Sequence, residues 1–195
     1  MYQTYLLTLV LGWTLAAAGQ APVQNKQFTD LAEYDAYMAA INEQVPANKV
    51  KLLDDFLAKY PNTVVKESAL ELKLVAQQQA GQPFDSTARQ ILAVNPNNFR
   101  ALVVLSFLFT QMPVSEQDPQ KDQKLSEAES LAKRGLEQLN AVPKPDNVSD
   151  ADFQKSKNVA AATFQQVMGT VAMGDRKSTR LNSSHIQKSR MPSSA

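Results

Sequence analysis

Two prolines, Pro61 and Pro96, stand 35 residues apart in the same local setting, "YPNT" and "NPNN". Each follows a segment with helical periodicity, and each precedes an asparagine. Proline disfavours helical geometry in the residue before it, so each site should end a helix. A helix end that recurs at a fixed spacing of this size is typical of architectures in which pairs of antiparallel helices repeat and stack.

Helical patterns fill the chain from residue 30 to residue 174. Apolar residues recur at helical spacing in seven segments, at about residues 31–41, 50–57, 67–79, 84–95, 99–112, 124–142 and 150–173. Asp30 with Glu33, and Ser149 with Asp152, have the spacing of helix N-caps with a partner in the first turn. Gly81 is placed to end the third helix.

The segment "FRALVVLSFLFTQM" at residues 99–112 is apolar nearly all round. Periodicity alone does not distinguish a buried strand from a buried helix. Its length and its helical neighbours favour a helix, and a strand is the weaker alternative. We therefore predict an all-α fold of stacked antiparallel helix pairs, because single pairs cannot bury their apolar faces alone.

The repeat period is close to the roughly 34 residues of tetratricopeptide repeats. The first helix of that repeat has two bulky positions, a small one and an aromatic one, which Leu102, Leu105, Ser106 and Phe109 match. The second helix has small positions and an adjacent bulky one, which Ala128, Gly135 and Leu136 match. Residues 30–174 thus resemble a degenerate tetratricopeptide-repeat domain, similar to repeat proteins exported by environmental bacteria. The family's Trp, Gly and Tyr positions are mostly substituted, and Sel1-like and HEAT-like arrays are the alternatives.

The resemblance implies a groove that binds protein or peptide, lined by the first helix of each pair. The positions that it assigns to this groove are Glu71, Val75, Gln78, Asn98, Arg100, Val103, Phe107 and Thr110. The alternative for Val75, Val103 and Phe107 is simple core packing. Asn98 with Arg100 resembles part of a clamp for a terminal carboxylate, although one asparagine and one arginine fall short of that clamp.

The first twenty residues carry no charge, and an apolar run near residues 5–15 leads into Ala16–Ala18. This pattern resembles a secretory signal peptide with a small-residue cleavage site. We predict a signal at residues 1–21, a linker at 22–29, and export to a periplasm or to the outside of the cell. The alternative is an uncleaved membrane anchor, since the first lysine is Lys26.

The last residues, Asp175–Ala195, are basic, rich in hydroxyl groups and without a helical pattern. Read backwards into codons, most of this tail resembles the constant parts of a common short-read sequencing adapter. We expect a disordered, non-native tail joined to a truncated gene, which would leave the helix at 150–173 without a covering partner. The alternative is a nucleic-acid arm, but the tail has no spaced aromatic residues.

Residue types also limit the chemistry of the chain. Without the tail, 15 basic and 18 acidic residues remain, which gives no basic footprint for nucleic acid. The chain has no cysteine, and its one histidine lies in the tail, so triads, thiol nucleophiles and most metal sites are not expected. Ser130 and Lys133 match S-x-x-K without its companion motifs, and the pair Asp54 and Asp55 fits a solvated surface.

We therefore expect a non-enzymatic module that binds protein or peptide, without cofactor or metal. The first alternative is a scaffold that self-associates or supports a lost C-terminal region. The second is an enzyme that uses carboxylate chemistry.

Overall fold

The computed structural model describes residues 28, 30–111, 114–115, 117–145 and 148–189, with side chains up to Gly174. In this part of the chain every regular element is an α-helix. The helices are α2 (Leu31–Asn42), α3 (Pro46–Lys59), α4 (Lys66–Gln79), α5 (Asp85–Val94), α6 (Phe99–Gln111), α7 (Lys121–Gln138) and α8 (Asp150–Ser189). None of these helices combines the length and apolar character that a membrane span needs.

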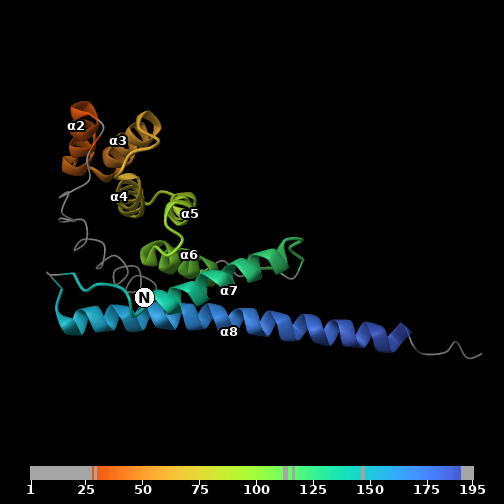
Figure 1. Ribbon diagram of the computed structural model, residues 1–195. Coiled ribbons are helices and arrows are strands. Elements are labelled where there is room, and N and C mark those ends of the chain that lie inside the picture. The colour runs from red at the N-terminus through yellow and green to blue at the C-terminus, as the bar shows by residue number, and fades with distance from the viewer. Residues whose placement is uncertain (1–27, 29, 112–113, 116, 146–147, 190–195) are drawn as a thin grey trace, which may run out of the picture.

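Each helix packs on the next, so the helices form a stack with α2 and α3 at one end and α8 at the other (Figure 1). Helix α6 contacts both α7 and α8, which joins the third pair to the helix that follows it. The predicted all-α, solenoid-like fold is confirmed, and residues 99–111 form a helix.

The two proline sites form matching turns. The N–H of Thr63 donates to the carbonyl of Tyr60 over 3.1 Å, and the N–H of Asn98 donates to the carbonyl of Asn95 over 3.0 Å. Each turn follows the last helical hydrogen bond of α3 or α5, as expected of the residue before proline. The 35-residue spacing of the two prolines therefore corresponds to a real recurrence in the backbone.

The predicted helix caps are present. Asp30 Oδ1 accepts from the N–H of Glu33 at 2.6 Å, and Ser149 Oγ accepts from the N–H of Asp152 at 3.1 Å. After α4, the N–H of Gln82 donates to the carbonyl of Gln77, and Gly81 has a φ of 66°. This is a Schellman cap, in which glycine takes the left-handed conformation without steric cost.

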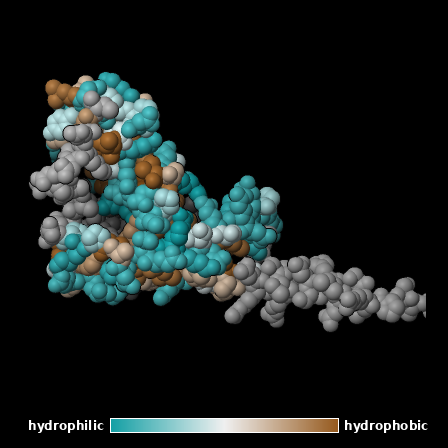
Figure 2. All heavy atoms as spheres, in the orientation of Figure 1, coloured by the Kyte–Doolittle hydropathy of each residue, from teal (hydrophilic) through white to brown (hydrophobic). Residues whose placement is uncertain are grey.

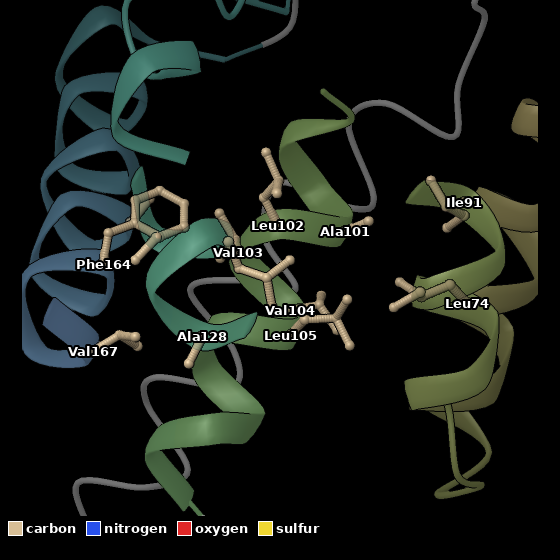
Figure 3. Packing of buried hydrophobic residues seen from close by; sticks show 14 of the residues in the cluster. Leu74, Ile91, Ala101, Leu102, Val103, Val104, Leu105, Ala128, Phe164 and Val167 are labelled. Carbon is tan, nitrogen blue, oxygen red and sulfur yellow. The ribbon is translucent and has the colours of Figure 1, made fainter. Parts of the chain in front are cut away.

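Two hydrophobic clusters hold the stack together. The larger runs from α4 to α8, and Figure 3 shows Leu74 and Ile91 on one side of α6 and Phe164 and Val167 on the other. The smaller joins α2, α3 and α4 around Tyr37, Leu53 and Phe56. Because α6 contributes to the middle of the larger cluster, its all-round apolar sequence follows from neighbours on several sides.

The apolar residues that recur at helical spacing in residues 31–41 are not all buried in helix α2. Leu31 is 72% exposed and Tyr34 is 38% exposed, whereas Tyr37 and Ala40 are buried. Among the described helices, α2 is the first of the stack and packs mainly against α3, so its side turned away from α3 is less covered. Helix α7 also begins three residues before the predicted Lys124, because the apolar pattern starts only at Leu125 while the polar first turn is already helical.

Helix α8 departs from the expected disordered tail in two ways. Its backbone stays helical to Ser189, and the first proline after Asp150 is Pro192, so no strong helix breaker stands between them. Its apolar face is also not bare: Phe164 and Val167 are fully buried against the stack (Figure 3). Among the described side chains of α8, Met173, which is 66% exposed, matches the predicted lack of cover.

Deletion of Asp175–Ala195 should change the free energy of unfolding by less than about 1 kcal/mol, as is usual for surface changes. The reason is compositional: the only aliphatic side chains between residues 175 and 189 are Leu181 and Ile186. Thermal unfolding of the full chain and of the deletion variant, followed by circular dichroism, measures the difference. A fall in melting temperature of 5 °C or more would mean that the tail packs on the stack.

Candidate functional site

The structure places the eight predicted groove residues on or beside one face of two helices. Glu71, Val75 and Gln78 lie on one side of α4 at helical spacing. Arg100, Val103, Phe107 and Thr110 follow one side of α6, and Asn98 directly precedes that helix. We call the surface formed by these eight residues the α4–α6 face.

Asn98 is tied to both helices of the face. Its Nδ2 donates to Glu67 Oε1 at 2.8 Å and to Glu71 Oε1 at 2.5 Å. Its Oδ1 accepts from the N–H of Ala101 at 3.0 Å, as an N-cap does. Asn98 is 7% exposed, so its polar atoms bridge the helices, and no part of the amide is left to clamp a ligand.

The polar side chains around Glu67 and Glu71 form a cluster that reaches from α2 to α6. Asn95 Nδ2 also donates to Glu67 Oε1, at 2.7 Å, from the turn after α5. Burial raises the pKa of the Tyr37 hydroxyl, the negative charge of Glu71 raises it further, and a hydrogen bond with Ser68 opposes both effects. Three successive first helices thus contribute polar side chains to one cluster.

Arg100 is the cation of this cluster. Its side chain is half-buried, and burial lowers the pKa of its guanidinium, while the charge of Glu71 acts in the opposite direction. Among the residues that the structure describes, Arg100 has no hydrogen-bond partner and no ion pair within 4.0 Å. A guanidinium carries five N–H donors, so Arg100 retains unused capacity for a ligand.

The apolar members of the face divide into two groups. Val75 and Val103 are each 6% exposed, so they belong to the core and present little surface to a partner. Phe107 is half-buried. Gln78 Oε1 is buried without a hydrogen bond in the described part of the chain, and Thr110 Oγ1 donates to the carbonyl of Phe107 at 2.7 Å.

The weaker sequence motifs lie on ordinary helix surface. Ser130 is exposed, and the Lys133 ammonium pairs with Glu129 at 2.6 Å, one turn earlier on α7. Asp54 pairs with Lys73 at 2.5 Å between α3 and α4, while Asp55 is exposed. Among the described residues, no group of three or more potential ligands could hold a metal ion.

Comparison with protein-family models, with curated proteins and with solved structures finds no match to this chain. Its function therefore has to be argued from the α4–α6 face itself.

Three residues of the cluster were not anticipated from sequence. Glu67 lies one turn before Glu71, Asn95 directly precedes Pro96, and Tyr37 was assigned only to the apolar face of α2. The repeat of the proline turns is the sequence feature that could have predicted these contacts. The turn at Pro96 brings Asn95 and Asn98 against the start of α4.

Substitution of Asn98 by alanine should lower the free energy of unfolding by about 2 kcal/mol. It removes an N-cap and leaves two partly buried carboxylates with fewer donors. Asn98→Asp keeps the cap acceptor but removes the donor to Glu67 and Glu71 and places a third carboxylate beside them, so it should be at least as destabilising as the alanine. Urea unfolding measures both variants.

Asn97→Ala is the matched control, because the exposed Asn97 contributes only its backbone N–H, to Asn95 Oδ1 at 3.1 Å. It should change the free energy of unfolding by about 0.5 kcal/mol or less. Equal losses in Asn97→Ala and Asn98→Ala would show that the bridge to Glu67 and Glu71 does not support the fold.

Proposed function

We propose that this protein is a non-enzymatic, tetratricopeptide-like module that binds an extended protein or peptide segment on the α4–α6 face. The observation that carries the proposal is the presence of donor and acceptor groups without partners on this face. Arg100 offers donors, and the half-buried Gln78 side chain carries an Oε1 atom without a hydrogen bond among the described residues. A polypeptide backbone supplies both complements, since each residue other than proline has one N–H and one C=O.

The half-buried Phe107 supports the same proposal. It lies between Arg100 and Thr110 on α6 and can contact an apolar side chain of the bound segment. The visible surface in Figure 2 is mainly hydrophilic, with small and separate apolar patches. None of the well-exposed large hydrophobic side chains of the described chain lies on α4 or α6. Recognition through a few polar groups and one aromatic ring therefore fits better than docking on a large apolar surface.

A display library of random peptides, selected against the full chain, tests the proposal. Selected peptides should bind at least about tenfold more weakly to Arg100→Ala, a loss of about 1.4 kcal/mol. Arg89→Ala is the matched control, because Arg89 lies on α5 and pairs with Glu127 away from this face. Equal weakening by both variants, or no selected peptide at all, would contradict the proposal.

Self-association as a scaffold is the second candidate function. Exposed apolar side chains lie near both ends of the described stack: Leu31 on α2 and Met173 on α8. Contact between such ends would join copies in a row. Sedimentation at concentrations up to about 100 μM distinguishes the two functions. A strict monomer that still binds peptide would exclude self-association and support peptide binding.

Export remains part of the proposal, and so does the non-native origin of the tail. The signal at 1–21 lies outside the described residues, as does the linker at 22–29 apart from Phe28, so both rest on the sequence. Sequencing the N-terminus of protein recovered from the cell envelope would separate a cleaved signal from an anchor. Sequencing the native locus past codon 174 would establish whether the tail belongs to the gene.

A further inference from the structure

A pocket of about 580 Å³ lies between α5, α6, α7 and the connection that precedes α7. Its apolar lining includes Leu105, Leu108 and Phe109 of α6 and Leu131 of α7. At about 100° per residue, Leu105 and Phe109 lie on the side of the helix opposite Arg100 and Phe107, and Leu108 lies about a quarter-turn from both. The pocket is therefore separate from the α4–α6 face, and an inference about it does not rest on the proposed function.

The connection between α6 and α7 builds one wall of this pocket, and hydrogen bonds hold it in place. Asp118 Oδ1 accepts from the N–H of Gln120 at 2.8 Å, and Asp118 Oδ2 pairs with the Lys124 ammonium at 2.6 Å. The hydrogen bond from Lys124, the largest effect, and that from Gln120 lower the pKa of Asp118.

The charges that line the pocket do not cancel. Arg89 pairs with Glu127, and Lys124 pairs with Asp118, so both cations are matched by carboxylates. Asp85, at the start of α5, also lines the pocket and forms no ion pair with any residue that the structure describes. The lining thus carries one excess negative charge above an apolar floor.

We propose that this pocket binds a small amphipathic cation, with an apolar body against the half-buried Leu108 and Phe109 and one ammonium group facing Asp85. The volume is within the range of pockets that bury small organic ligands, roughly 300–1,000 Å³. An anion of the same shape meets the excess carboxylate unfavourably. Because Asp85 is exposed, its charge selects the sign of the ligand, and the apolar floor supplies most of the affinity.

Octylammonium and octanoate are suitable probes, because they share an apolar chain and carry opposite charges. Each is titrated into the isotope-labelled full chain, and amide chemical shifts report the site and the dissociation constant. Octylammonium should bind about fivefold more tightly than octanoate, the difference expected for an exposed charge pair. The shifts should concentrate in α5, in α7 and around Leu105–Phe109.

Two variants and one control make the test specific. Asp85→Asn should bring the two affinities within about twofold, whereas Asp55→Asn, an exposed carboxylate on α3, should leave the difference unchanged. Ser115→Trp, on the exposed wall, should weaken both probes by filling the pocket. Equal binding of both probes to the unchanged protein, shifts located elsewhere, or no binding of either would overturn the inference.

Discussion

Substitution of Leu102 by aspartate should abolish the cooperative folding of the stack. Leu102 is 0% exposed in the larger cluster, between helices on both sides of α6 (Figure 3). The variant loses the packing of a leucine, about 2–5 kcal/mol, and buries a carboxylate without a partner. Together these costs are comparable with the whole stability of a domain, about 5–15 kcal/mol. Circular dichroism and a thermal melt should show a mostly unfolded chain.

The matched control is the same substitution at an exposed leucine. Leu31 is 72% exposed in the first turn of α2, where an acidic residue interacts favourably with the helix dipole. Leu31→Asp should therefore keep its melting temperature within a few degrees of the unchanged protein. A cooperative Leu102→Asp melt at a similar temperature would show that α6 is not central to the core.

Substitution of Gly135 by alanine should lower the free energy of unfolding by up to about 2 kcal/mol. A Cβ atom at Gly135 would overlap the ring of Phe164, which is fully buried and stacks edge-on against Phe99 at 5.9 Å. Overpacking of this kind costs roughly 1–3 kcal/mol or more, which exceeds the gain of about 1 kcal/mol from replacing glycine inside a helix. Urea unfolding measures the net loss.

Gly169 provides the opposite expectation in the same protein. A Cβ atom there meets nothing within 4 Å, so Gly169→Ala should stabilise the fold by up to about 1 kcal/mol. Phe164→Leu removes the ring atoms that meet the new methyl group, so the added cost of Gly135→Ala should be smaller in that background. If Gly135→Ala and Gly169→Ala both stabilised the protein, α7 and α8 would not pack as closely as the structure shows.

Local patterns predicted the helices well because their signals are short-range. Asp30, Gly81 and the two prolines act through their own backbone, and the structure contains each cap or turn that they indicated. The small residue Gly135 was also identified, since close packing of two helices needs a position without a side chain. The caps and turns could be predicted because each is decided within one or two helical turns, and Gly135 could be predicted because the repeat pattern marks it.

Features that depend on distant neighbours were predicted less well. Leu31 fits the helical pattern but is exposed, because the apolar pattern of α2 does not show how many neighbouring helices cover it. Val75 and Val103 have groove spacing but are buried in the core, because the spacing of residues along one helix does not tell which neighbouring helices cover them. The pocket was not anticipated, because its wall is a connection whose path depends on single contacts such as Asp118 with Lys124.

Hydrogen exchange in the presence and absence of a selected peptide tests the central claim, that the α4–α6 face binds polypeptide. Bound peptide should slow exchange in residues 67–79 and 99–111 and leave α5 and α7 much as they are in the free protein. The Arg100→Ala variant should lose this protection at the same peptide concentration. Protection confined to α5 and α7, or to the ends of the stack, would contradict the claim.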